Sequence, residues 1–339
     1  MADPIAPPEP SPLARPPLHP LLRSFLYLLT FFLCQRLLSA GVAGIGHLLE
    51  DKWLGRGSFL TSNEALLVTF ALVALPALGI TKLFVEVLDR RTLASLGLRW
   101  PVGGRRQALR ELVTLPLAAL ALIGGWFLLL LALPHGLAAL HVGGLSADML
   151  KGRAWWPLPP ILLFPILLLL FLVQGGIEEL VIRGYVYHAL RERWRAGMAA
   201  LASSMVFALL HTANPGISAA ALINIVLAGL VLAALVERSQ SLWGATVAHG
   251  VWNFSLSCLA SLPVSGFPLF HLLKVSVTGD ERATGGIFGP EGSLALTALG
   301  LPLAAYLWWR MPARPAGDVE DTEDTPLSAP EDAVPHPPL

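Results

Sequence analysis

Residues 175–185 read GGIEELVIRGY and directly follow the apolar run ILLFPILLLLFLVQ at 161–174. A run of this kind is typical of a membrane-spanning helix, which needs ~20 mostly apolar residues. Two adjacent glutamates, Glu178 and Glu179, and then Arg183 stand at its end. Charged side chains in a spanning helix are costly and usually face the protein interior or a wet cavity. These three charges therefore mark the place to look for chemistry.

The composition of the chain is that of an integral membrane protein. Of its 339 residues, 55% are hydrophobic and only 14% are charged, and the mean hydropathy is +0.65. Soluble domains carry roughly 25% charged residues. The formal net charge is zero, so the overall charge does not favour nucleic acid as a partner. Cys34 and Cys258 both stand in apolar segments and are interpreted as small hydrophobic residues, not as a disulfide or a metal site.

Apolar segments along the whole chain predict an all-α fold, a polytopic transmembrane helical bundle of about eight spans. The segment that carries the glutamates is longer than a bilayer requires, so its far end is expected to leave the hydrocarbon as a continuing helix. The predicted spans are 22–48, 64–88, 112–134, 158–188, 197–213, 217–236, 242–262 and 292–310.

Arginine residues near the helix ends set the predicted orientation. With eight spans, the arginine-rich loop at 89–111 and the RERWR turn at 191–195 fall on the same side as both ends of the chain. The opposite side is less basic but not empty. Both termini are therefore expected to be cytosolic. Leu and Trp residues between the arginines of the 89–111 loop suggest a segment that lies on the membrane surface, although a plain basic loop would carry the same charges.

Composition also divides the chain into five parts. Both ends are rich in Pro and the C-terminal end is rich in Asp and Glu, so the ends cannot bury a core and are expected to be disordered. The predicted parts are a tail at 1–21, helices with the basic loop at 22–154, a core at 155–262, a loop with the last helix at 263–310, and an acidic tail at 311–339.

Spacing separates the three charges of the quoted stretch. Glu179 and Arg183 are four residues apart, so they lie on one helix face and can form an ion pair. Glu178 is rotated by about 100° from Glu179 and is left without that partner. Gly175 and Gly176 just before them would let a substrate or a neighbouring helix come close. The alternative interpretation is a buried ion pair that only holds the helices together.

Two further pairs of residues that include polar side chains occur on later spans. Phe207 and His211 are four residues apart in VFALLHTANP, and His249 and Asn253 have the same spacing in VAHGVWNFS, so each pair shares a helix face. On its own, a histidine such as His211 is more often a hydrogen-bonding residue of a helix end. A pair such as His249 and Asn253 is more often a hydrogen-bonding group that joins helices, worth less than ~2 kcal/mol. Asn224 in the sixth span is interpreted in that way.

Taken together, the three motifs supply a workable hydrolytic site. A desolvated Glu178 would act as general base on a water molecule that His211 holds and orients. His249 and Asn253 would donate hydrogen bonds to the oxyanion that forms when water adds to an amide carbonyl. In a supporting role, Arg183 would keep Glu179 ionised and the helix in place. Such a site requires no metal and no cofactor.

The order and spacing of these motifs, Glu-Glu-x-x-x-Arg, Phe-x-x-x-His and His-x-x-x-Asn, resemble those of the CPBP family of intramembrane proteases, also called the ABI family. This family includes type II CAAX prenyl proteases and bacterial lysostaphin-resistance and bacteriocin-processing proteins. The resemblance covers about 155–260. It implies an eight-helix core with a membrane-embedded glutamate protease site, in which Glu178 is the base, His211 positions the water, and His249 and Asn253 are the oxyanion donors.

The substrate class is less specified by the sequence. Prenylated CAAX proteins are eukaryotic, whereas the Ala-, Leu-, Arg- and Pro-rich composition is more typical of a bacterium with a high-GC genome. The expected location is therefore a bacterial plasma membrane, and the expected partners are the lipid bilayer and a peptide or membrane-protein substrate. At about 1.5 Å of rise per residue, His211 lies farther than His249 from the cytosolic end of its span. The helices are therefore expected to be tilted or offset, or the fifth helix to begin outside the hydrocarbon.

Three other functions stay open at this point. A metal-dependent membrane hydrolase would use the same carboxylate and imidazoles as zinc ligands, although the sequence has no His-Glu-x-x-His motif. A catalytically silent scaffold or a bacteriocin-immunity-type protein would keep the bundle and bind a partner through its tails. A transporter is disfavoured because the intramembrane charges gather in one half of the chain and paired broken helices are not apparent. The oligomeric state is not indicated.

Overall fold

The computed structural model describes residues 18–49, 63–134, 137–145, 160–270 and 272–311. This part of the chain is mostly helical, and each of the eight predicted spans overlaps a helix. The helices are α1 (Pro20–Leu49), α2 (Asn63–Leu83), α3 (Gly104–Ala132), α5 (Pro160–Glu179), α6 (His188–Arg191), α7 (Ala196–Leu209), α8 (Ala219–Ser239), α9 (Leu242–Phe254), α10 (Glu281–Thr284) and α11 (Leu294–Trp309).

Three π-helical segments continue these helices. Phe84–Leu88 extends α2, Leu180–Tyr187 joins α5 to α6, and Ser255–Leu259 extends α9. Wide turns of this kind are rare and are often found at functional sites. The middle segment directly follows the two glutamates, and the side chain of His188 hydrogen-bonds the carbonyl oxygen of Arg183 at 2.7 Å. The long predicted helix at 158–188 is therefore one continuous helical run that ends at Arg191.

Several helices have the length and composition to cross a membrane. Four helical segments qualify among the described residues, and two shorter helices, Ala196–Leu209 and Leu294–Trp309, are also apolar; the four are Pro20–Ile45, Gly104–Ala132, Phe164–Arg191 and Ala219–Ser239. Along α1, apolar side chains such as Leu33 and Leu37 are largely exposed. The chain is therefore a helical membrane protein, whereas the number of eight spans and the cytosolic termini remain predictions.

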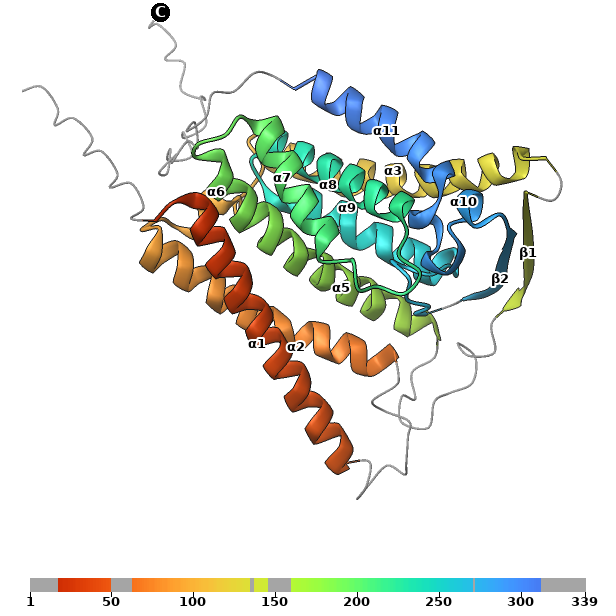
Figure 1. The fold of residues 1–339 in the computed structure, drawn as a ribbon, viewed down its shortest axis with the longest axis horizontal. Helices are drawn as coiled ribbons and strands as arrows, with labels where there is room; N and C mark the ends of the chain where they lie inside the picture. Colours follow the sequence, from red (N-terminus) through yellow and green to blue (C-terminus); the bar gives the residue numbers. More distant parts are fainter. Residues whose placement is uncertain (1–17, 50–62, 135–136, 146–159, 271, 312–339) are drawn as a thin grey trace, which may run out of the picture.

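The helices form a central group with a pair on either side (Figure 1). α5, α7, α8 and α9 pack against one another in the centre, α1 and α2 cover one side of α5, and α3 and α11 pack on α9 and α8. Two apolar clusters fill the interior. One surrounds Tyr185 and Phe207, and the other surrounds Trp126 and Phe254. The motifs predicted from the sequence all lie on the central group.

The basic loop at 89–111 is shorter than predicted, because α3 already begins at Gly104. Before it, a 3-10 turn at Leu93–Leu96 leads into a segment that binds the turn between α8 and α9. There the amide of Leu242 donates to the carbonyl of Gly97, and the amide of Val102 donates to the carbonyl of Ser239. The loop is thus held against the start of α9, and Trp100 stays exposed.

The fold also contains a small sheet that was not predicted. β1 (Ala138–Leu145) pairs antiparallel with β2 (Leu273–Gly279), from Ala138 opposite Gly279 to Leu145 opposite Leu273, with an irregularity near the last pair. The all-α prediction is therefore incomplete. AALHVGGL has little of the alternation that marks a strand, and its partner is remote in sequence. The predicted tails, 1–21 and 311–339, lie almost entirely outside the described residues, as does the boundary between 154 and 155.

Candidate active site

Glycines bring the helix that carries the two glutamates against the helix that carries His249. α5 and α9 meet at Gly175 and Gly250. A Cβ atom on Gly175 would lie 3.0 Å from the backbone nitrogen of Gly250, and one on Gly250 would lie 2.7 Å from the Cα atom of Leu172. Only a glycine fits such a backbone contact. The close approach of a neighbouring helix, expected from the glycines before Glu178, is present.

Glu179 is a buried residue that contacts both Arg183 and His249. Its Oε1 atom accepts a hydrogen bond from Arg183 Nη1 at 3.0 Å, which is the ion pair that the spacing predicts. The same oxygen contacts His249 Nδ1 at 2.8 Å. Glu179 and Arg183 are both fully buried. Because a carboxylate can only accept, the proton lies on His249 Nδ1, and the Nε2 atom of this ring is left for another group.

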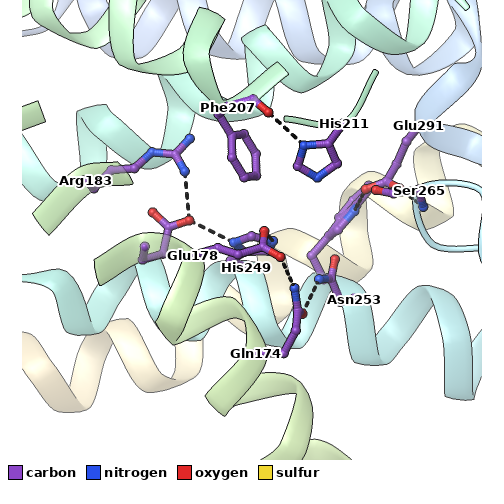
Figure 2. Close-up of polar contacts among 11 residues, drawn as sticks. Gln174, Glu178, Arg183, Phe207, His211, His249, Asn253, Ser265 and Glu291 are labelled. Carbon is purple, nitrogen blue, oxygen red and sulfur yellow. Dashed lines mark hydrogen bonds and ion pairs between the residues drawn. The ribbon is translucent and has the colours of Figure 1, made fainter. Parts of the chain in front are cut away.

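Glu178 has a different setting. Its side chain is 31% exposed, and its Oε2 atom lies 3.7 Å from His249 Nε2. Its other oxygen accepts a hydrogen bond from Gln174 Nε2 at 2.5 Å. The one exposed carboxylate of the pair therefore faces the free edge of the His249 ring (Figure 2).

Gln174 was not predicted as a site residue, and it joins two residues that were. Its Oε1 atom accepts a hydrogen bond from Asn253 Nδ2 at 2.8 Å while its Nε2 atom donates to Glu178. The four-residue spacing from Gln174 to Glu178 was visible in the sequence as a helical neighbour pair. The contact with Asn253 was not, because it depends on the crossing of α5 and α9.

His211 lies just beyond the end of α7, in the turn before α8. Its Nδ1 atom is 2.7 Å from the carbonyl oxygen of Phe207, so this nitrogen carries a proton and the neutral ring has an acceptor at Nε2. The Phe207 ring packs edge-on against His211, with centroids 4.6 Å apart, and against His249, with centroids 6.0 Å apart. The two histidines therefore flank one aromatic ring (Figure 2).

The same ring supports the buried arginine. The guanidinium carbon of Arg183 lies 4.5 Å from the Phe207 centroid, over the face of the ring. Such a cation–π contact stabilises a charge that has little access to water. The sequence indicated no role for Phe207 beyond its place in the Phe-x-x-x-His motif. In the structure its ring contacts three side chains of the site, those of Arg183, His211 and His249.

Some polar atoms around Arg183 have no hydrogen-bond partner among the described residues. They are Arg183 Nε and Nη2, Glu179 Oε2 and Ser204 Oγ. Buried polar groups of this kind are commonly satisfied by internal water. Gly229 on α8 makes room here, since a Cβ atom at this position would lie 2.5 Å from Ser204 Oγ and 3.0 Å from Arg183 Nη2.

The predicted site residues thus form one assembly built from three elements. Glu178, Glu179 and His249 are in direct contact, Arg183 binds Glu179, and Asn253 joins through Gln174. His211 reaches the group through Phe207. Within the described residues, no three His, Cys, Asp or Glu side chains are grouped so that they could hold a metal ion. The arrangement offers a partly exposed carboxylate, two imidazoles and an amide.

Comparison with known proteins bears on the same segment. Residues 160–255 match the family model described as type II CAAX prenyl endopeptidase Rce1-like. No curated protein matches the chain. The matched residues run from the start of α5 to the end of α9 and contain Glu178, His211 and Asn253. The site described above therefore lies within an Rce1-like domain, which confirms the resemblance to the CAAX protease family seen in the three motifs.

Proposed function

We propose that this chain is an intramembrane peptidase in which Glu178 activates a water molecule to hydrolyse a peptide bond. The observation that carries the proposal is the unequal setting of the two glutamates. Glu179 is fully buried and held by Arg183 and His249, whereas Glu178 is 31% exposed and 3.7 Å from His249 Nε2. A base must reach both its water and its substrate, and only Glu178 meets that requirement.

In the proposed reaction, Glu178 takes a proton from a water molecule while the water oxygen bonds to the carbonyl carbon of the scissile amide. The carbonyl becomes a tetrahedral oxyanion. When it collapses, the C–N bond breaks, and the proton held by Glu178 passes to the leaving nitrogen. The products are a carboxylic acid and an amine, and the glutamate returns to its starting state.

His249 and Asn253 are the proposed donors to the oxyanion. Because His249 Nδ1 donates to Glu179, its Nε2 atom can donate only when the ring is doubly protonated, and this ring lies between the carboxylates of Glu178 and Glu179. Asn253 Nδ2 has two hydrogens, of which Gln174 takes one. The second is available to substrate. Prearranged donors of this kind cost no reorganisation when the charge develops.

His211 is the proposed water-positioning residue. Its hydrogen bond to the Phe207 carbonyl leaves Nε2 as an acceptor, which suits a group that holds one hydrogen of the attacking water. Arg183 and Glu179 act through other residues, because they hold His249 and the helix from the buried side.

The family match supports a CAAX-type intramembrane protease activity. For the substrate we propose a peptide or membrane-associated protein, cleaved in a bacterial plasma membrane by a bundle of eight spans.

Glu178→Gln tests the proposal. This variant keeps the size of the side chain and removes the base. Cells that express the wild type are expected to contain new peptide termini in their membrane proteome. In cells that express the variant, the abundance of these termini is expected to be at least about 100-fold lower, the typical contribution of a general base. Quantitative mass spectrometry of new termini measures this, with the membrane abundance of the protein as the reference.

Glu86→Gln is the matched control, because Glu86 is an exposed glutamate in the π-helical extension of α2. It is expected to retain the wild-type termini. Unchanged termini in the Glu178→Gln cells would refute the peptidase proposal, and an unchanged cellular phenotype as well would favour the scaffold or immunity alternative.

A further inference from the structure

Glu291 lies outside the matched domain. It is bound to Trp252 on α9 and to Ser265 in the loop after α9. Its Oε1 atom accepts a hydrogen bond from the indole Nε1 of Trp252 at 2.9 Å. Its Oε2 atom accepts from the backbone nitrogen of Ser265 at 2.6 Å and from the Ser265 hydroxyl at 3.0 Å. Charge-assisted hydrogen bonds such as these are stronger than neutral ones. One carboxylate therefore ties α9 to the loop that follows it.

The contact on α9 bears on His249 and Asn253. Trp252 directly precedes Asn253 and lies three residues after His249. Successive helical residues are about 100° apart around the axis. A hydrogen bond that holds the Trp252 indole therefore limits rotation of α9, and so sets the direction of both proposed oxyanion donors.

The contact on the loop bears on His211. The carbonyl oxygen of Ser265 accepts a hydrogen bond from Asn214 Nδ2 at 3.0 Å, and the amide of Asn214 donates to the carbonyl of His211 at 3.0 Å. Backbone contact reinforces this connection, because a Cβ atom on Gly266 would lie 2.2 Å from the carbonyl oxygen of Pro215. The turn that carries His211 thus contacts the turn at 264–267, which is bonded to Glu291 through Ser265.

The turn at 264–267 has an unfavourable backbone conformation. Val264 and Phe267 bond to each other across it, while Ser265 has φ +49° and Gly266 has φ +90°. A left-handed conformation is disfavoured for a residue with a side chain. Glu291 accepts from both the amide and the hydroxyl of Ser265, which offsets this cost. Unfavourable backbone that persists in this way is concentrated at functional sites.

Glu291 is itself fixed from a third direction. Asn224 Nδ2 on α8 donates to the carbonyl oxygens of Glu291 and Ser293, at 2.9 and 2.8 Å, and Asn224 Oδ1 accepts from the Thr297 hydroxyl at 2.7 Å. Asn224, interpreted from the sequence as a group that joins helices, thus joins α8 to the segment that carries Glu291. Figure 2 shows Ser265 and Glu291 beside His211 and Asn253.

From these contacts we propose that Glu291 is a positioning residue that keeps His211 in register with His249 and Asn253. This rests on the proposed function only for its consequence in catalysis; the mechanical connection stands apart from it. Misplacement of reacting groups by about 1 Å costs about 100-fold in rate. Glu291→Gln places an amide that must turn a donor toward Trp252 or Ser265, so it weakens the connection with little change in volume.

Hydrogen–deuterium exchange of the purified protein tests the connection without a substrate. In Glu291→Gln, exchange is expected to rise at least several-fold in the turn 211–217, which is joined to Glu291 through Ser265, as well as in 263–267. Glu281→Gln, which changes an exposed glutamate on α10 of the same segment, is expected to leave both unchanged. A rise confined to 263–267 would overturn the proposal.

The catalytic consequence is measured as the rate of appearance of the new termini per folded protein. We expect about a 10-fold loss in Glu291→Gln and a similar loss in Trp252→Phe, which keeps an aromatic side chain and removes the indole donor. The double variant should be no slower than Glu291→Gln alone. A rate per folded protein equal to the wild type, or fully additive losses, would overturn the positioning role. If the wild type itself produces no termini, the peptidase proposal fails, and the exchange measurement still decides the connection.

Discussion

Gln174 gives the two ends of the proposed site a common partner. An ionised Glu178 can only accept, so it turns the Gln174 amide nitrogen toward itself and the Gln174 oxygen toward Asn253. Asn253 must then present its own nitrogen. The charge of Glu178, the proposed base, thereby sets the direction of the proposed oxyanion donor through the side-chain amide of Gln174.

Replacing Gln174 with Leu is expected to lower the cleavage rate by about 10- to 100-fold, since Glu178 and Asn253 lose their common orientation. The rate of new termini per folded protein measures this. Gln107→Leu is the matched control, because Gln107 makes the same four-residue bond to Glu111, at 2.7 Å, on α3. Equal losses in the two variants would show that the effect is general to such pairs and not specific to the site.

At the scale of elements, glycines decide how closely the central helices approach. Gly175 and Gly250 set the contact between α5 and α9, and Gly229 sets the contact between α8 and the pair Arg183 and Ser204. Each of these glycines stands in a helix, where it is intrinsically unfavourable, by roughly 0.5–1 kcal/mol relative to Ala. Through these close contacts, the buried ion pair of Glu179 and Arg183 lies next to His249.

Gly229→Ala is expected to destabilise the protein by about 1–3 kcal/mol, because its Cβ atom would lie 2.5 Å from Ser204 Oγ and 3.0 Å from Arg183 Nη2. Thermal unfolding in detergent measures the change. Gly300→Ala on α11 is the control, since its Cβ atom would meet only Leu227 at 3.8 Å. That variant is expected to be neutral or slightly stabilising. The packing argument fails if the two variants melt alike.

At the scale of the whole molecule, a buried arginine connects the N-terminal helices to the Rce1-like domain. Arg23 on α1 is fully buried and forms ion pairs with Asp89, after α2, and with Glu192, after α6, the latter at 2.5 Å. Arg91 adds a bond to Glu192 at 2.9 Å. Beside this group, the rings of Tyr27 and Tyr185 stack with centroids 4.1 Å apart. α1 and α2 are thus part of the same folded unit as the site.

Arg23→Met is expected to cost about 3–5 kcal/mol, because the buried carboxylate of Asp89 loses its ion-pair partner and Glu192 loses one of its two arginine partners. Lys82→Met breaks an exposed pair with Glu86, 3.9 Å long, and is expected to cost no more than about 1 kcal/mol. Thermal unfolding compares the two, and exchange in α1 reports whether this helix has detached. A loss in Arg23→Met no larger than in the lysine variant would contradict the connection.

The sequence alone determined the helical membrane class, the overlap of all eight apolar segments with helices, and the family resemblance, because these depend on composition, apolar runs and spacing along single helices. The Glu179–Arg183 pair belongs with them, since both residues are on one helical run. Tertiary structure decided what spans different helices: the bond from His249 to Glu179, the link through Gln174 and the support from Glu291. It also decided the pairing of β1 with β2. These contacts depend on where helices cross and how loops return, and spacing along one helix carries no information about either.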